Sequence, residues 1–122
     1  AYAGTPYDGV FLACVICSYM AKENIPLSDI SSKIPPYHIA RGEIFLPGSA
    51  ASFLRYLRTS AFSEAAAEFD DGLKILYGKS FASLTPSFDG NSVKVKTESD
   101  GERGAKQMLA SIEKLAENMK TQ

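Results

Sequence analysis

The sequence predicts an α+β fold: an antiparallel sheet of about four strands with two helices packed on one face, preceded by one or two lead-in helices. Three observations indicate it. Short alternating segments separated by turn formers fill residues 72–97, a strand-like segment at 37–46 leads into a helix-like one, and a long amphipathic stretch follows residue 99. An antiparallel sheet of this size needs helices on one face to bury its apolar side chains.

Composition indicates an ordinary globular domain and argues against two classes of partner. The chain has 122 residues, room for one hydrophobic core, with 45% apolar and 22% charged residues. Its formal net charge is −1 and its cations are scattered, so no nucleic-acid partner is expected. No apolar run approaches the roughly 20 residues that span a bilayer. We therefore expect no membrane partner and a cytoplasmic location.

The first segment predicts a helix that needs neighbours on several sides. Asp8 is a suitable N-cap for an apolar helix over residues 10–23, which Ile25-Pro26 ends. A second short helix, capped by Ser28, runs to residue 33. The first helix is apolar around much of its circumference, and so short a chain can hardly cover it. Because the first residue is also not Met, we expect a piece of a larger protein.

Cys14 and Cys17 form a C-x-x-C pair inside this first helix. In redox proteins such a pair stands at a helix N-terminus after a strand, where the dipole lowers the thiol pKa. Here the flanks are apolar and no strand precedes the pair, so buried core thiols are expected. Since the sequence has one histidine, His38, a zinc site lacks its further ligands and no metal site is predicted.

Residues 37–46 predict a strand, followed by a turn and a helix. Its two sides carry Tyr37, Ile39 and Phe45 on one and Ala40, Ile44 and Leu46 on the other. Pro47-Gly48-Ser49 is a turn that ends in a helix cap, and residues 50–58 then place an apolar stripe on one helix face.

Residues 60–97 predict a run of antiparallel strands with one ambiguous segment. At 60–70 the alanines favour helix, whereas a position just before Asp70-Asp71-Gly72 suits the first strand of a hairpin. Strands at 73–77 and 80–84 flank a tight turn. Residues 85–91 predict a loop, and residues 92–97 alternate with Val93 and Val95 inward and the lysines outward.

The closing segment predicts an amphipathic helix laid on the sheet. Ser99 and Glu102 have the spacing of a capping box. Apolar residues then recur at spacings of three and four, at Ala105, Met108, Leu109, Ile112, Leu115, Ala116 and Met119.

With this order of elements, the chain resembles the C-terminal end of the α-D-phosphohexomutases, the phosphomannomutase and phosphoglucomutase family. DGVFLACVICSYMAKENIPLSDISSKIPPYH resembles the last helix and hinge of that family's third domain, and FDDGLKILYGKSFASLTPS resembles part of its fourth. The likeness covers about residues 8–119. It implies that residues 1–34 are the tail of a preceding domain and that residues 35–122 are the C-terminal phosphohexomutase-like domain.

The resemblance implies a role in binding rather than in chemistry. The family's fourth domain closes over the active site and contacts the sugar phosphate, whereas its phosphoserine and Mg²⁺-binding aspartates belong to earlier domains. We therefore expect no catalytic residue and no cofactor in this chain, with Mg²⁺ implied for the parent enzyme. The expected partners are a phosphosugar, reached through the parent enzyme, and the preceding domains of the same polypeptide.

The phosphate-binding loop departs from the family pattern, which is R-P-S-[NG]-T-E-P. Here residues 85–91 have the sequence TPSFDGN, in which only Pro86 and Ser87 match. Thr85 stands where the family has its bidentate arginine, and Asp89 adds a negative charge. Ser87 and Thr85 are therefore predicted as a weak phosphate site.

The altered loop leaves two other interpretations open. PPYHIARGEI is closer to mutase-like domains that follow a nucleotidyltransferase, as in mannose-1-phosphate guanylyltransferase fusions, where the chain would be a degenerate binding or assembly module. A free-standing α+β interaction domain is the third. Elsewhere, His38 is expected to pack structurally, and Asp70-Asp71 to be solvated turn acids. Arg41 and Lys79 could face an anion but are expected to be ordinary surface charges.

Overall fold

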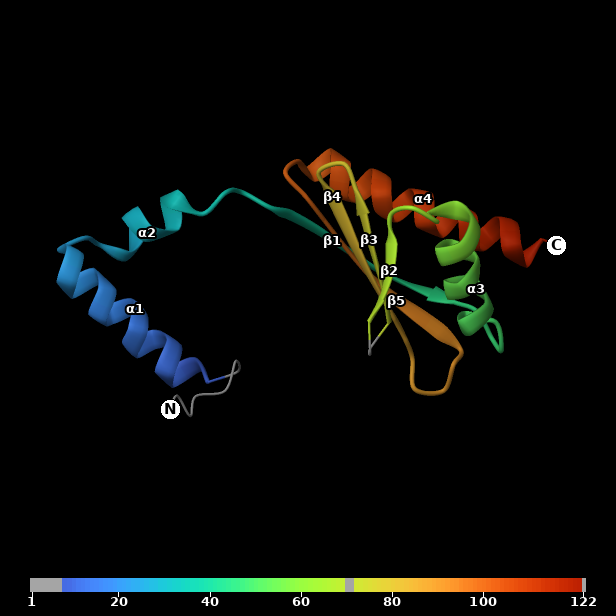
Figure 1. The fold of residues 1–122 in the computed structure, drawn as a ribbon, viewed down its shortest axis with the longest axis horizontal. Coiled ribbons are helices and arrows are strands. Elements are labelled where there is room, and N and C mark those ends of the chain that lie inside the picture. Colours follow the sequence, from blue (N-terminus) through green and yellow to red (C-terminus); the bar gives the residue numbers. More distant parts are fainter. Residues whose placement is uncertain (1–7, 70–71, 122) are drawn as a thin grey trace. The chain divides into compact units, whose positions relative to one another are not determined.

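The computed structural model describes residues 8–69 and 72–121. The chain divides into two compact units, residues 1–35 and 36–122. The first unit holds α1 (Gly9–Glu23) and α2 (Leu27–Lys33), and the second holds the sheet and its two covering helices (Figure 1). The α+β class predicted from the sequence is confirmed, and every sheet residue belongs to the second unit.

The first helix begins and ends where the sequence predicts. The Asp8 carboxylate accepts a hydrogen bond from the Phe11 N–H at 2.9 Å, which satisfies one free donor of the first turn. At the other end Asn24 takes the left-handed conformation, with φ of 51°, that commonly closes a helix. The predicted Ser28 cap is wrong, because α2 begins at Leu27 and its N-cap position is Pro26.

The prediction of buried cysteines is wrong for this chain. Neither α1 nor α2 has a buried residue, and Cys14 and Cys17 are both exposed as free thiols. Two short helices are too small to bury side chains between them, so the apolar side chains of α1 remain exposed to solvent. Val10 and Leu12 keep 78% and 58% of their surface exposed. Among the described residues of the first unit, α1 is thus left uncovered.

The second unit is built on five strands rather than about four. They are β1 (His38–Phe45), β2 (Ala66–Phe69), β3 (Gly72–Tyr77), β4 (Ser80–Pro86) and β5 (Ser92–Ser99), in the order β1-β5-β4-β3-β2 with every pair antiparallel. The additional strand is β2, from the ambiguous segment. Pairing with β3 satisfies its backbone groups, and this outweighs the helix propensity of its alanines.

Within the second unit, two helical segments cover one face of the sheet and leave the other face uncovered (Figure 1). They are α4 (Glu102–Lys120) and α3 (Ala50–Tyr56), which continues into a π-helical turn, Leu57–Ala61. Alternate strand residues point at these helices and form one core with them. Its fully buried large side chains are Phe53, Leu57, Ile75, Leu84, Val93, Thr97 and Ile112.

The start of α4 corrects the predicted capping box. Gly101 occupies the N-cap position and makes no side-chain cap, while Ser99 is the last residue of β5 and is buried. The Ser99 hydroxyl accepts a hydrogen bond from the Ser80 hydroxyl at 3.1 Å. Ser99 therefore joins β5 to β4 instead of capping the helix. Ser49 stands at the N-cap of α3 but also makes no side-chain cap.

Candidate functional site

Thr85 lies at the end of a strand, not in the predicted loop. The strand β4 extends to Pro86, and Thr85 is the register partner of Lys94 on β5. Its neighbour Leu84 is completely buried under the helices, so the Thr85 side chain points to the uncovered face of the sheet. The two residues predicted to bind phosphate therefore lie in different elements, Thr85 in the sheet and Ser87 in the turn.

The turn that follows, residues 87–91, folds around the carboxylate of Asp89. The Ser87 hydroxyl donates to Asp89 Oδ1 at 2.5 Å, and the Asn91 backbone N–H donates to the same oxygen at 3.1 Å. The Asn91 side-chain amide donates to Oδ2 at 3.2 Å. Both carboxylate oxygens therefore have donors from the loop itself, an arrangement typical of Asx turns.

These contacts use the full hydrogen-bonding capacity of the Ser87 hydroxyl. It donates its one proton to Asp89, and its oxygen accepts from the backbone N–H groups of Asn91 at 3.2 Å and Ser92 at 3.0 Å. The bond from Ser87, followed by the bonds from Asn91, lowers the pKa of Asp89 below its ordinary value of 3.8. The loop thus favours an anion, and its own side chain supplies one.

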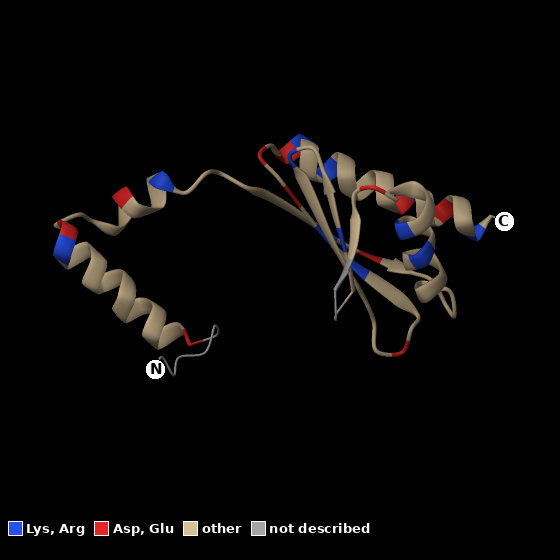
Figure 2. Cartoon of the chain, viewed as in Figure 1, with Lys and Arg blue, Asp and Glu red and all other residues tan. Residues whose placement is uncertain are grey.

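On the uncovered face beside Thr85, the sheet carries a cluster of cations that the sequence analysis did not bring together. One shallow depression of about 460 Å³ is lined by three cations, Arg41 from β1 and Lys94 and Lys96 from β5, together with Ser83, Thr85 and the acidic Glu43. Figure 2 shows the blue segments of neighbouring strands crossing the middle of the sheet. This cluster could be found only from the strand register, because residues 41 and 96 become neighbours through the pairing of β1 with β5.

The other singled-out residues lie away from this depression. His38 is exposed at the start of β1, so the expected packing role is not seen in this chain. Lys79 forms an exposed ion pair with Asp100 at 3.2 Å, as befits an ordinary surface charge. Asp70 and Asp71 lie outside the described residues.

Two further findings bear on the chemistry. Within residues 8–69 and 72–121, no three His, Cys, Asp or Glu side chains come together as a group that could hold a metal ion. In the same residues, no single helix is long and apolar enough to cross a membrane. The pair α1 and α2 meets that criterion by length and composition together, but its two helices are bent by 101° at their junction.

Comparison with known proteins adds no family. No protein-family model matches the chain, and no curated protein matches it.

Proposed function

We propose that this chain is the C-terminal region of a phosphomannomutase- or phosphoglucomutase-like enzyme. In this proposal the unit of residues 36–122 closes over the active site of the parent enzyme and contacts the phosphate of its hexose substrate. Thr85 and Ser87 are the contacts that the resemblance implies. The first unit, with its exposed apolar helix α1, is the tail of the preceding domain, which supplies the missing cover.

The observation that carries this proposal is the turn after β4. A hydroxyl, a backbone N–H and a side-chain amide converge there on the carboxylate of Asp89. Such a set of donors suits any oxyanion, including a phosphate. Since the turn stands where the resemblance places the family's phosphate loop, a phosphate that displaced Asp89 would meet donors that are already convergent.

The proposed role is binding and closure, and the chemical step belongs to the parent enzyme. The phosphoserine and the Mg²⁺ of the family's reaction would both lie in preceding domains of the same polypeptide. The described residues offer no cluster of metal ligands, so no Mg²⁺ step is assigned to this chain. Alone, it should not interconvert mannose 1-phosphate and mannose 6-phosphate.

An equilibrium titration of the whole chain tests the proposal. Mannose 1-phosphate and glucose 6-phosphate should bind at millimolar concentration, as measured by calorimetry, whereas unphosphorylated mannose should not. This difference follows because the loop and the adjoining sheet face offer donors and cations rather than a sugar-shaped pocket. If neither phosphosugar binds at solubility-limited concentration, or if mannose binds equally well, the proposal is wrong.

The same turn also favours a second candidate, the degenerate binding or assembly module of a nucleotidyltransferase fusion. Here Asp89 permanently occupies the loop donors, and Thr85 supplies no charge to displace it. A double variant, Thr85→Arg with Asp89→Asn, should then create a phosphosugar affinity that the native chain lacks. Native affinity equal to that of the double variant would rule this candidate out.

A further inference from the structure

The uncovered face of the sheet carries like charges as direct neighbours. The register places Arg41 of β1 opposite Lys96 of β5, and Lys96 opposite Ser83 of β4. In the next row Lys94 stands opposite Thr85 on one side and Glu43 on the other. Directly opposed side chains have Cβ atoms about 5 Å apart, and like charges at that separation destabilise a sheet. Glu98, which pairs with Lys96, offsets part of this repulsion, and a bound anion would offset more of it.

The acidic residues of this face leave two of its cations without an ion pair. Glu98 pairs with Lys96 at 2.9 Å, and the two are neighbours along β5. Glu43 accepts a hydrogen bond from the Ser92 hydroxyl at 2.6 Å. Among residues 8–69 and 72–121, the Arg41 guanidinium and the Lys94 ammonium form no ion pair.

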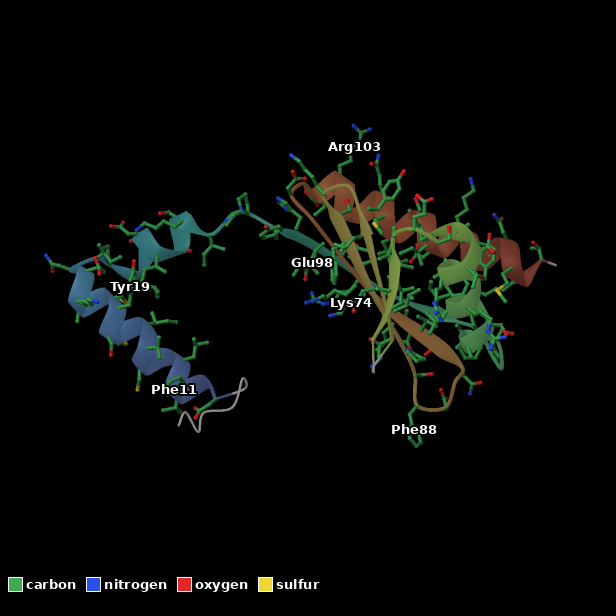
Figure 3. The ribbon with its side chains drawn as sticks, in the orientation of Figure 1. Phe11, Tyr19, Lys74, Phe88, Glu98 and Arg103 are labelled. Atoms are coloured by element: carbon green, nitrogen blue, oxygen red, sulfur yellow. The ribbon has the colours of Figure 1, made fainter. Side chains whose placement is uncertain are left out.

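Side chains of several strands project from this same face. Figure 3 shows Lys74 and Glu98 projecting from the side of the sheet that lies away from α3 and α4. Lys74 lies over the Phe81 ring, 6.0 Å from its centroid. Lys74 and Phe81 occupy one part of the face, while Arg41 and Lys94 line the depression beside it together with the hydroxyls of Ser83 and Thr85.

We propose that Arg41 and Lys94, with the hydroxyls of Ser83 and Thr85, form a binding site for the phosphate group of a phosphorylated hexose on this open face. The identification of the ligand as a sugar phosphate rests on the proposed function. The site itself rests on the two cations and the two hydroxyls. It lies outside the turn of residues 87–91, whose donors Asp89 occupies.

The chemistry of the site suits a small phosphate monoester. A guanidinium binds two phosphate oxygens in parallel, an ammonium adds a second charge, and hydroxyls donate to the remaining oxygen. A depression of about 460 Å³ is within the usual range for small-molecule sites. Glu43 also lines this depression and opposes a bound anion, so the two charges of Arg41 and Lys94 must outweigh its one. A long polyanion would meet Glu98 on the same face as well, so a nucleic acid is disfavoured.

The test compares two double variants of the whole chain that each remove two positive charges. Arg41→Gln with Lys94→Gln should weaken mannose 1-phosphate binding at least about tenfold, because each charge-assisted contact contributes a factor of this order. The control is Arg103→Gln with Lys114→Gln, two exposed positions on α4, which covers the opposite face. Its affinity should stay within about twofold, since distant exposed charges are largely screened.

The outcomes separate this inference from the proposed function. If the Arg41/Lys94 variant binds mannose 1-phosphate as tightly as the native chain, the open-face site is wrong and the proposed function stands. Equal weakening in both double variants would show a nonspecific charge effect and would also overturn the site. If the native chain binds no phosphosugar, both proposals fall. Inorganic phosphate serves as the probe for the anion alone and should show the same dependence on Arg41 and Lys94.

Discussion

At the scale of single residues, Asp89 places its own carboxylate where the hydrogen-bond donors of its loop converge. The loop 87–91 has no cation, yet its polar groups converge on one point. The carboxylate of Asp89 fills that point through bonds from Ser87 and Asn91. An external phosphate must therefore compete with a carboxylate that is tethered to the same loop. This competition is the physical reason to expect weak binding at Ser87.

Acid titration of Asp89 should report these bonds directly. Its pKa in the folded chain lies below the ordinary 3.8, so the carboxylate contacts contribute stability above that value and lose it as the pH falls through the folded pKa. The Asn91 amide resonance should follow the titration with a midpoint below 3.8. A midpoint at or above this value would contradict the loop geometry, and Asp89→Asn should abolish the transition.

Gly72 is a second residue whose conformation fixes local structure. Its φ is +151°, and a Cβ there would overlap the carbonyl oxygen of Leu84 on the neighbouring strand. Gly72→Ala should therefore lower the free energy of unfolding by roughly 2 kcal/mol or more, from backbone strain and steric overlap together. Urea denaturation of the whole chain measures this change.

Gly78, in the turn between β3 and β4, is the matched control. Its φ is +60°, but nothing lies within 4 Å of a Cβ built there. Gly78→Ala should thus lower the free energy of unfolding by only about 1–2 kcal/mol, the strain of holding alanine in the left-handed conformation. Equal losses for the two variants would mean that the close approach of β3 to β4 at Gly72 is not as described.

At the scale of elements, the helix α4 holds the sheet through one apolar stripe. Ile112 is completely buried in that stripe, between the helix and the strands. Ile112→Ala should lower the free energy of unfolding by about 2–5 kcal/mol, because it removes buried methyl groups and leaves a cavity. Lys114→Ala, an exposed position on the same helix, should change it by no more than about 0.5 kcal/mol. A small effect at Ile112 would contradict this packing.

The elements with strong periodicity could be predicted from sequence, and those decided by partners could not. Residues 105–119 show the helical spacing clearly, and Val93 and Val95 alternate as a half-buried strand must. The segment containing β2 could not be assigned, since its alanines favour helix and pairing with β3 decides otherwise. Ser99 has the local spacing of a helix cap, yet its hydroxyl bonds across the sheet to Ser80.

The first helix, α1, gives a prediction about its thiols. The sequence alone suggests that Cys14 and Cys17 are buried, because their neighbours are apolar. In the structure both are exposed, and among the described residues of the first unit none buries a side chain of α1. Both thiols should therefore react with an aromatic disulfide reagent in the folded chain at rates close to those in denaturant. Protection of either thiol in the native chain would contradict this exposure.

At the scale of the whole molecule, the candidate site depends on sheet order. Ser87 and Thr85 could be singled out from sequence because they match a known loop pattern. The pairing of Arg41 with Lys96 of β5 could not, because more than fifty residues separate them in the chain and only register joins them. A net charge close to zero also conceals a face that carries several cations. The net charge of −1 excludes a global field, but not a local site.

The central claim is that the unit of residues 36–122 contacts a sugar phosphate where β4 ends. Nitrogen–proton correlation NMR of the whole chain, titrated with mannose 1-phosphate and separately with mannose, tests it most directly. We predict saturable shifts in the amides of residues 83–94 and of Arg41 with the phosphosugar and none with mannose. The claim is contradicted if the phosphosugar produces no shifts, or shifts confined to α4 or to the first unit.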